Sequence, residues 1–370
     1  MSKLPMRLRS ARHAAACVIA LFCIGGEARA DGLLHISDCR IVDDRGPVKA
    51  IGVNFVNGFW KFSRDGDRGA YLPYLDALAA AKVPFIRMAF GPWARYQPGT
   101  PAPQIGDFVA HRKRYFDRLG IFLADLRARH IGAVVDVFWN VDPYSVFFEE
   151  PPSATGNPAS RTSAFLDAVL REFGRRFGSD PTIWLVEFTN EGNLQIDFPR
   201  ARHSRAGLVA LNRRLAATLR AAGDRHLFDS GNALPRPAAE HLFEHAGWTP
   251  DGRADFLRAL AAETAPGIAV ASIHVYPEKP AARPWDRGTI FDALPMIVRR
   301  SRRACRPVFL GEFGFSGQTP ERKSIQQVAD SGVQMAAIWG FGRPPSDRYA
   351  FGPDRRGMAL LAILERHPPN

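Results

Sequence analysis

The feature that most limits what this chain can fold into is a repeated alternation of short apolar runs and longer amphipathic segments. Eight runs have strand-like character: 50–55, 85–89, 132–137, 183–189, 226–229, 268–273, 307–310 and 334–338. Eight segments between or after them place apolar residues at helical spacing: 72–81, 115–129, 163–177, 207–222, 254–262, 290–304, 325–331 and 358–365. This alternation is typical of a parallel α/β architecture.

Eight such units favour a closed (β/α)₈ TIM barrel over an open doubly wound sheet. The open sheet stays an alternative, but no Gly-x-Gly-x-x-Gly turn follows the first strand, so the usual support for a dinucleotide-binding fold is missing. A short β-hairpin is expected over 33–49, before the first core strand. We therefore predict a single barrel domain over residues 31–370.

Residues 1–30 have the layout of a secretory signal peptide. Basic residues precede an apolar stretch at 14–24, and the small-residue pattern Ala28-Arg-Ala30 follows it. The apolar stretch is shorter than the roughly 20 residues that a membrane-spanning helix needs. We expect cleavage after Ala30 and a secreted or periplasmic protein without a membrane span in the mature chain.

Charge and cysteine content narrow the possible partners. Residues 1–30 hold five basic residues and one acidic residue, so the formal charge of +12 falls to +8 in the mature chain. The basic residues are spread along the sequence and form no tract with interleaved aromatics, which argues against a nucleic-acid partner. An acidic polysaccharide substrate is compatible with this charge. Cys39 and Cys305 remain after cleavage, and the sequence leaves open whether they pair.

Two glutamates stand at the ends of strand-like runs and are far apart in the sequence. Glu191 follows the fourth run, and Glu312 follows the seventh. In a barrel, the carboxyl ends of the strands meet on the face where active sites are built. Two carboxyl groups facing each other there can protonate a leaving oxygen and attack or stabilise a sugar carbon, which is the chemistry of a glycosidase.

Further polar and aromatic residues stand at the ends of the other predicted strands. Each one alone has an ordinary structural explanation, such as a turn cap or an ion pair. Their convergence at one face instead indicates a sugar-binding site. The predicted substrate-binding residues are Arg87, Trp139, Asn140, Asn190, His274, Tyr276 and Trp339.

The ordered set of these motifs resembles the retaining glycoside hydrolases of clan A, and is most similar to the cellulase-like family 5. The matches are Arg87, Asn190-Glu191, His274-Val-Tyr276, Glu312 in Gly-Glu-Phe-Gly, and Trp339. The resemblance implies that Glu191 is the acid/base and Glu312 the nucleophile. It also implies that Asn190 contacts the sugar 2-hydroxyl, that His274 contacts the acid/base or the substrate, and that Trp339 stacks on a pyranose ring.

One position departs from the family pattern. Family 5 members commonly carry a histidine at the end of strand three, where this chain has Phe138, Trp139 and Asn140. Trp139 and Asn140 are expected to serve as a stacking and hydrogen-bonding pair, with a buried core Trp139 as the alternative. Four more aromatic residues are expected to extend a sugar cleft, namely Trp60, Trp93, Tyr96 and Trp285.

The sequence supports a retaining hydrolase of β-linked poly- or oligosaccharides, with two alternatives. One is a non-catalytic carbohydrate-binding barrel, and the other is a transglycosylase that remodels envelope or exported polysaccharide. A retaining enzyme is expected to hold its two carboxyl groups about 5 to 5.5 Å apart, whereas a separation near 8 Å would indicate inversion. We expect no cofactor, no metal and a monomeric state. The sugar itself stays open.

Overall fold

The protein is described by a computed structural model over residues 32–198, 201–276, 290–314 and 321–366. The predicted signal peptide and Trp285 lie outside the described residues. Among those that are described, no helix combines the length and the apolar character needed to cross a bilayer.

Eight parallel strands form the barrel that the sequence predicts. They hydrogen-bond in the order β8-β7-β6-β5-β4-β11-β10-β9. The ring closes between β8 and β9, because the backbone nitrogens of Ala269 and Val270 both donate to the carbonyl of Phe228, at 3.1 Å each. The strands are β4 (Ala50–Asn54), β5 (Phe85–Ala89), β6 (Gly132–Asp136), β7 (Ile183–Glu187), β8 (Leu227–Asp229), β9 (Ala271–Val275), β10 (Val308–Phe313) and β11 (Met335–Ile338).

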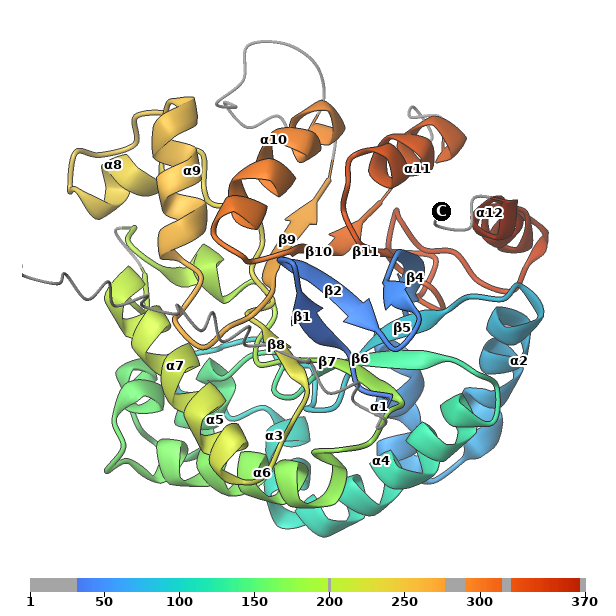
Figure 1. Ribbon diagram of the computed structural model, residues 1–370. Coiled ribbons are helices and arrows are strands. Elements are labelled where there is room, and N and C mark those ends of the chain that lie inside the picture. The colour runs from blue at the N-terminus through green and yellow to red at the C-terminus, as the bar shows by residue number, and fades with distance from the viewer. Residues whose placement is uncertain (1–31, 199–200, 277–289, 315–320, 367–370) are drawn as a thin grey trace, which may run out of the picture.

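Helices surround this barrel (Figure 1). Each segment predicted to be helical contains a helix, with ends that differ by a few residues. The α-helices are α1 (Val56–Asp65), α2 (Leu72–Ala80), α3 (Pro103–Ala110), α4 (Arg112–Arg127), α5 (Asp142–Phe147), α6 (Arg161–Phe177), α7 (Arg205–Ala221), α8 (Ala239–Phe243), α9 (Arg253–Ala262), α10 (Ile290–Arg303), α11 (Glu321–Asp330) and α12 (Arg355–Arg366). Short 3₁₀ helices are η1 (Arg68–Ala70), η2 (Pro152–Gly156) and η3 (Gly192–Gln195).

Some boundaries differ from the sequence prediction. Helix α1 begins one residue after β4 and was not among the predicted helices. Its Asn57 and Gly58 have low helix propensity, although the buried Val56, Phe59 and Phe62 recur at helical spacing. The sixth strand was expected over 268–273 but lies at Ala271–Val275. Residues 268–270 instead form the link that closes the ring toward β8.

The long helices of the outer ring follow simple local rules. Helix α6 begins at Ser160, whose side chain accepts a hydrogen bond from the backbone nitrogen of Ser163 at 2.9 Å. Its apolar residues recur every three or four positions and are buried against the barrel. Strands β4, β5 and β6 are buried along their whole length, which explains why they read as continuous apolar runs.

The predicted hairpin is a small antiparallel sheet of three strands, β1 (His35–Ser37), β2 (Arg40–Asp43) and β3 (Gly46–Pro47). Its segment buries Leu34, Ile41 and Val48 in one cluster with side chains from seven of the eight barrel strands and with Val270, which directly precedes β9. Figure 1 shows the small sheet in front of the centre of the barrel. It therefore closes the N-terminal opening and leaves the opposite face for the site.

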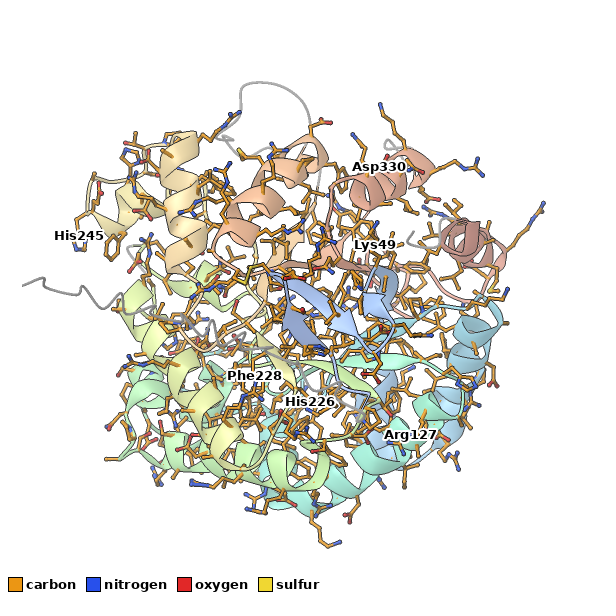
Figure 2. The ribbon with its side chains drawn as sticks, viewed as in Figure 1. Lys49, Arg127, His226, Phe228, His245 and Asp330 are labelled. Atoms are coloured by element: carbon orange, nitrogen blue, oxygen red, sulfur yellow. A yellow bond between two sulfur atoms is a disulfide. The ribbon has the colours of Figure 1, made fainter. Side chains whose placement is uncertain are left out.

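Two further contacts fix this N-terminal end. A disulfide joins Cys39, beside β2, to Cys305, just before β10. His226, labelled in Figure 2, directly precedes β8 and is buried, with Nδ1 3.1 Å from Asp224 and Nε2 2.9 Å from the carbonyl of Asp180. These contacts join the start of β8 to the segment before β7.

Candidate active site

The predicted site residues come together at the carboxyl ends of the strands. Arg87 lies on β5, His274 on β9 and Glu312 on β10. Asn190 and Glu191 follow β7, and Tyr276 follows β9. The remaining predicted residues, Trp139, Asn140 and Trp339, follow β6 and β11. All nine therefore lie at one end of the barrel, opposite the small N-terminal sheet.

Arg87 is the fully buried centre of the hydrogen-bond network. Its Nε and Nη2 donate to the two carboxylate oxygens of Glu187, at 2.6 and 2.9 Å. Its Nη1 donates to Glu312 Oε1 at 2.8 Å and to Asn54 Oδ1 at 3.0 Å. Nη2 also donates to Asn190 Oδ1 at 2.8 Å. One guanidinium thus holds residues from β4, β7 and β10 in a fixed arrangement.

The charges around Arg87 are mutually compensating. Burial lowers the pKa of Arg87, but the carboxylates of Glu187 and Glu312 outweigh that effect, and the pKa stays above its usual value. Two more buried carboxyl groups, Asp136 and Asp229, lie nearby. Burial and then the charge of Glu187 raise the pKa of each well above its usual value, which favours their protonated forms. The site therefore holds a permanent cation between two carboxylates.

A bulge in β10 positions Glu312. The register between β10 and β9 shifts between Leu310 and Glu312, so that one extra residue, Gly311, is accommodated. A Cβ at Gly311 would lie 2.8 Å from Nε2 of His274, which is too close for any other residue without a shift. Asn54 donates from Nδ2 to the carbonyl of Gly311 at 2.9 Å and holds the bulge.

The Glu312 carboxylate receives a hydrogen bond on each oxygen. Arg87 binds Oε1, and the Tyr276 hydroxyl donates to Oε2 at 2.6 Å. Burial, followed by the charge of Glu312, raises the pKa of Tyr276 well above its usual value, so the hydroxyl keeps its proton and remains a donor. Arg87 and Tyr276 together therefore hold both carboxylate oxygens of Glu312.

Glu191 lies opposite Glu312 on the loop after β7. Its backbone is left-handed, with φ 54° and ψ 33°, and its side chain is 28% exposed, compared with 6% for Glu312. His274 Nδ1 is 3.2 Å from Glu191 Oε1 and 3.5 Å from Glu312 Oε1. One oxygen from each carboxylate and one ring nitrogen of His274 lie within 4.8 Å of one another. The imidazole therefore sits between the two acids, and these three groups also have the spacing that a divalent cation requires.

Trp139 lies in the segment after β6, where the family histidine was expected and where this chain has Phe138 and Trp139. Its backbone is left-handed, with φ 59°, and its nitrogen donates to Asp136 Oδ1 at 2.7 Å. Its ring lies over the Arg87 guanidinium, 5.2 Å from the ring centroid, and its centroid is 6.3 Å from that of Trp339. Its carbonyl accepts from the backbone nitrogen of Asn190 at 2.7 Å. Trp139 is thus mostly buried, yet it also forms part of the site wall.

Two cavities flank Trp139 and Trp93. One of about 350 Å³ lies beside Glu191, and its lining includes Asn140, Asn190 and His203. The other, of about 300 Å³, is lined on the far side by Trp60, Asn57, Gln104 and Arg343. The two tryptophans line both cavities, and the Arg343 guanidinium lies 4.1 Å from the centroid of Trp93. The described part of the site therefore offers aromatic surfaces in two cavities, one of which is also lined by Glu191.

The predicted contact residues differ in their local roles. Asn140 Oδ1 accepts from the backbone nitrogen of Asp142 at 3.1 Å, so this side chain also begins the turn of α5. Trp339 donates from Nε1 to Asp347 at 3.0 Å. Of the predicted cleft aromatics, Trp60 and Trp93 line a cavity, whereas Tyr96 packs against Arg202 at 4.6 Å.

Three residues around the site were not assigned a functional role from the sequence. Glu187 was predicted to be a structural charge paired with an arginine, and its partner is Arg87 itself. Arg343 and Asp347 lie after β11, and the sequence alone gave neither residue a role in the site. The sequence signal for them was the Gly- and Pro-containing stretch 340–345, which resembles the other functional loops of this face.

Comparison with known proteins identifies the fold. No protein-family model and no curated protein matches the sequence. Solved structures do match: an endo-1,4-β-mannanase from Rhizomucor miehei superposes with a TM-score of 0.65 at 14% identity, over 90% of this chain and 98% of the mannanase. A glycoside hydrolase family 5 mannosidase from the same organism gives 0.63 at 13% identity, over 90% and 97%. An endo-β-1,4-glucanase from Xanthomonas axonopodis pv. citri gives 0.58 at 17% identity, over 86% and 100%. The chain shares the barrel fold of these glycoside hydrolases.

Proposed function

We propose that this protein is a retaining glycoside hydrolase that cleaves β-linked poly- or oligosaccharides, with Glu312 as the nucleophile and Glu191 as the acid/base. The observation that supports this most directly is the approach of the two carboxylates, one oxygen of each lying within 4.8 Å of the other. Inverting enzymes need about 6.5–9.5 Å to place a water molecule beside the sugar, whereas retaining enzymes need about 5–5.5 Å. The short separation therefore supports a covalent intermediate.

In the first step, a Glu312 oxygen attacks the anomeric carbon while the bond to the leaving oxygen breaks. Glu191 transfers its proton to that oxygen. The hydrogen bonds from Arg87 and Tyr276 hold the Glu312 carboxylate in place for the attack. Glu191 is more exposed than Glu312 and lies beside His274, at the position from which it would deliver its proton to the leaving oxygen.

In the second step, the Glu191 carboxylate takes a proton from water, and the water oxygen attacks the anomeric carbon and releases Glu312. Asn190 is oriented for the sugar during both steps. Because Arg87 can only donate, Asn190 must point Oδ1 at it, which turns Nδ2 away from the guanidinium. That nitrogen can donate to a sugar hydroxyl, in a bond that strengthens in the transition state.

The substrate and location are parts of the same proposal. The solved structures that share the fold are named as mannanases, a mannosidase and a glucanase, so β-1,4-mannan and β-1,4-glucan are the first substrates to test. Trp139, Trp339 and Trp93 provide apolar faces for pyranose rings. We further propose an exported protein, because the Cys39–Cys305 disulfide suits an oxidising compartment.

The test is turnover of a panel of β-linked polysaccharides by the wild type, Glu312→Ala and Glu191→Gln. We expect retention of anomeric configuration by NMR and a fall in kcat of at least about 1,000-fold in Glu312→Ala. Glu244→Gln, at an exposed site after α8, is the control, and its activity should be unchanged.

Full activity in either site variant would overturn the assignment, and oligosaccharide binding without product would favour the binding barrel. Products lengthened at high acceptor concentration would instead indicate transglycosylation.

A further inference from the structure

The position of Glu191 depends on a very short element. Directly after this residue the chain forms η3 (Gly192–Gln195), a single 3₁₀ turn. Within this turn, the backbone nitrogen of Leu194 donates to the carbonyl of Glu191 at 3.0 Å. Such short 3₁₀ turns have poor hydrogen-bond geometry and little stability of their own. Contacts from outside the turn must therefore fix the direction in which the Glu191 side chain points.

The loop after β8 supplies the first external contact. The backbone nitrogen of Glu191 donates to the carbonyl of Gly231 at 2.7 Å. Gly231 has φ +64°, and a Cβ there would lie 1.8 Å from the carbonyl oxygen of Thr189, so only glycine allows this close approach. This bond fixes the chain on one side of the Glu191 side chain.

Asn193 supplies the contact on the other side. This residue is 1% exposed, and its amide makes three hydrogen bonds. Nδ2 donates to the carbonyl of Ala233 at 2.9 Å, and Oδ1 accepts from the nitrogen of Ala233 at 2.9 Å. Nδ2 also donates to Glu263 Oε2 at 2.7 Å. The amide therefore joins η3 to two separate parts of the barrel rim in one geometry.

Further hydrogen bonds fix the residues that surround Asn193. Glu263 ends α9 and is 2% exposed, and its backbone carbonyl accepts from Asn232 Nδ2 at 3.0 Å. Arg236 donates to the carbonyl of Leu194 and ties the same turn to the loop after β8. The loop after β8 and the end of α9 thus form a rigid support beneath the turn that follows Glu191.

We propose that Asn193 is a positioning residue for Glu191, acting through η3 and not through the substrate. The inference rests on the proposed function, since it assigns Asn193 to the acid/base half of that mechanism. The hydrogen bonds that Glu312 receives from Arg87 and Tyr276 do not involve the loop after β7, so loss of the Asn193 contacts leaves these two bonds in place. Removing Asn193 should therefore impair proton transfer while leaving nucleophilic attack intact.

Leaving-group dependence separates these two effects. With aryl β-glucosides, β-mannosides and their disaccharide analogues, a 2,4-dinitrophenyl group departs without protonation, whereas an alkyl or sugar leaving group needs the acid. We expect Asn193→Ala to lower kcat/KM about 100-fold for the poor leaving groups and less than about 3-fold for 2,4-dinitrophenyl. Azide should raise kcat of the variant on the dinitrophenyl substrate, because it replaces the water that Glu191 would activate.

Two more variants keep the test decisive. Asn193→Asp has nearly the same volume and retains an oxygen for the Ala233 nitrogen, so it should fold and show an intermediate loss of about 10-fold. Asn212→Ala removes another buried asparagine, on α7, whose side-chain atoms have no hydrogen-bond partner within the described residues, and should show no leaving-group dependence. Equal losses on both substrate types, or none, in folded Asn193 variants would overturn the inference. Inactivity of the wild type on every glycoside would instead remove the proposed function, and this inference with it.

Discussion

At the scale of single residues, the site is organised by one buried cation. Arg87 replaces its hydration shell with hydrogen bonds to Glu187, Glu312, Asn54 and Asn190. A buried charge is tolerated only when it is paired and fully hydrogen-bonded, and the planar guanidinium can satisfy several acceptors at once. The same bonds orient a proposed nucleophile and a proposed substrate contact, so stability and function depend on the same side chain.

Arg87→Lys tests whether this geometry matters beyond its charge. A lysine keeps the positive charge but cannot bind Glu187, Glu312 and Asn190 together. We expect kcat/KM to fall by about 100-fold or more, as for the loss of one oriented donor at a reacting centre. Steady-state kinetics on the best substrate measure this. Arg129→Lys, whose partner Asp76 is exposed, is the control, and equal effects of the two substitutions would contradict the prediction.

At the scale of elements, strand ends and short turns position the two glutamates of the site. The bulge at Gly311 turns Glu312 toward the site, and η3 turns Glu191 toward it from the opposite side. The bulge lies within β10, and η3 lies on the loop after β7. Burial of these two regular strands fixes their register. The barrel thus supplies rigid anchors, and one or two residues at each anchor set the direction of a carboxyl group.

Gly311→Ala should separate this directional effect from overall stability. The new Cβ would meet His274 Nε2 at 2.8 Å, so either the imidazole or the bulge must shift. We expect kcat to fall at least about 10-fold, with misplacement of Glu312 as the cause. Gly352→Ala is a matched control, because a Cβ there meets nothing within 4 Å. Unchanged kinetics in Gly311→Ala would show that the site tolerates the shift.

The end of α9 makes stability depend on pH. Burial raises the pKa of Glu263 to about 8, against the opposing hydrogen bond from Asn193. Since the folded pKa is above the unfolded one, the stabilisation is complete below about pH 4.5 and is lost as the pH rises through 8. Glu263→Gln cannot ionise. Urea unfolding at pH 5 and pH 8 should show wild-type stability falling by a few kcal/mol relative to the variant, whereas a constant difference would contradict this.

At the scale of the whole molecule, the small N-terminal sheet and the disulfide close the end of the barrel opposite the site. Leu34, Ile41 and Val48 bury the ends of the strands, and Cys39–Cys305 joins the start of the domain to the segment before β10. This division assigns stability to one face and chemistry to the other. Changes at the closed end should therefore alter the unfolding transition more than catalysis.

The disulfide allows a direct test of that division. Its two cysteines are 266 residues apart in the sequence, so the bond removes a large loop entropy from the unfolded chain. Replacing both with serine should lower the free energy of unfolding by about 2–5 kcal/mol and Tm by about 5–10 °C. Activity at 25 °C should be unchanged. Calorimetry measures the stability and kinetics measure the activity of the same preparation. A loss of activity without a loss of stability would contradict the assignment of stability to this end of the barrel and of chemistry to the other.

Much of this arrangement could be predicted because it depends on local pattern. The alternation of apolar runs and amphipathic segments predicted the barrel, which the structure confirms, since burial on both faces of a parallel strand imposes such runs. Strand ends then placed nine candidate residues on one face. Helix α1 was not predicted, and the sixth strand was expected to begin at residue 268 instead of Ala271, because propensity and hydrophobicity are weak signals where a loop joins a core element.

The sequence by itself therefore determined the eight core strands, the main outer helices and the set of side chains that gather at the carboxyl-terminal end of the barrel. Only the tertiary structure decided how those side chains pair: that Arg87 joins Glu187 to Glu312, that Trp139 covers the guanidinium, and that Asn193 holds the turn after Glu191. The physical reason is the separation along the chain of the residues that interact. Periodicity reflects burial of neighbouring residues, whereas these bonds join residues far apart in the chain, and their distances exist only once the ring of strands has closed.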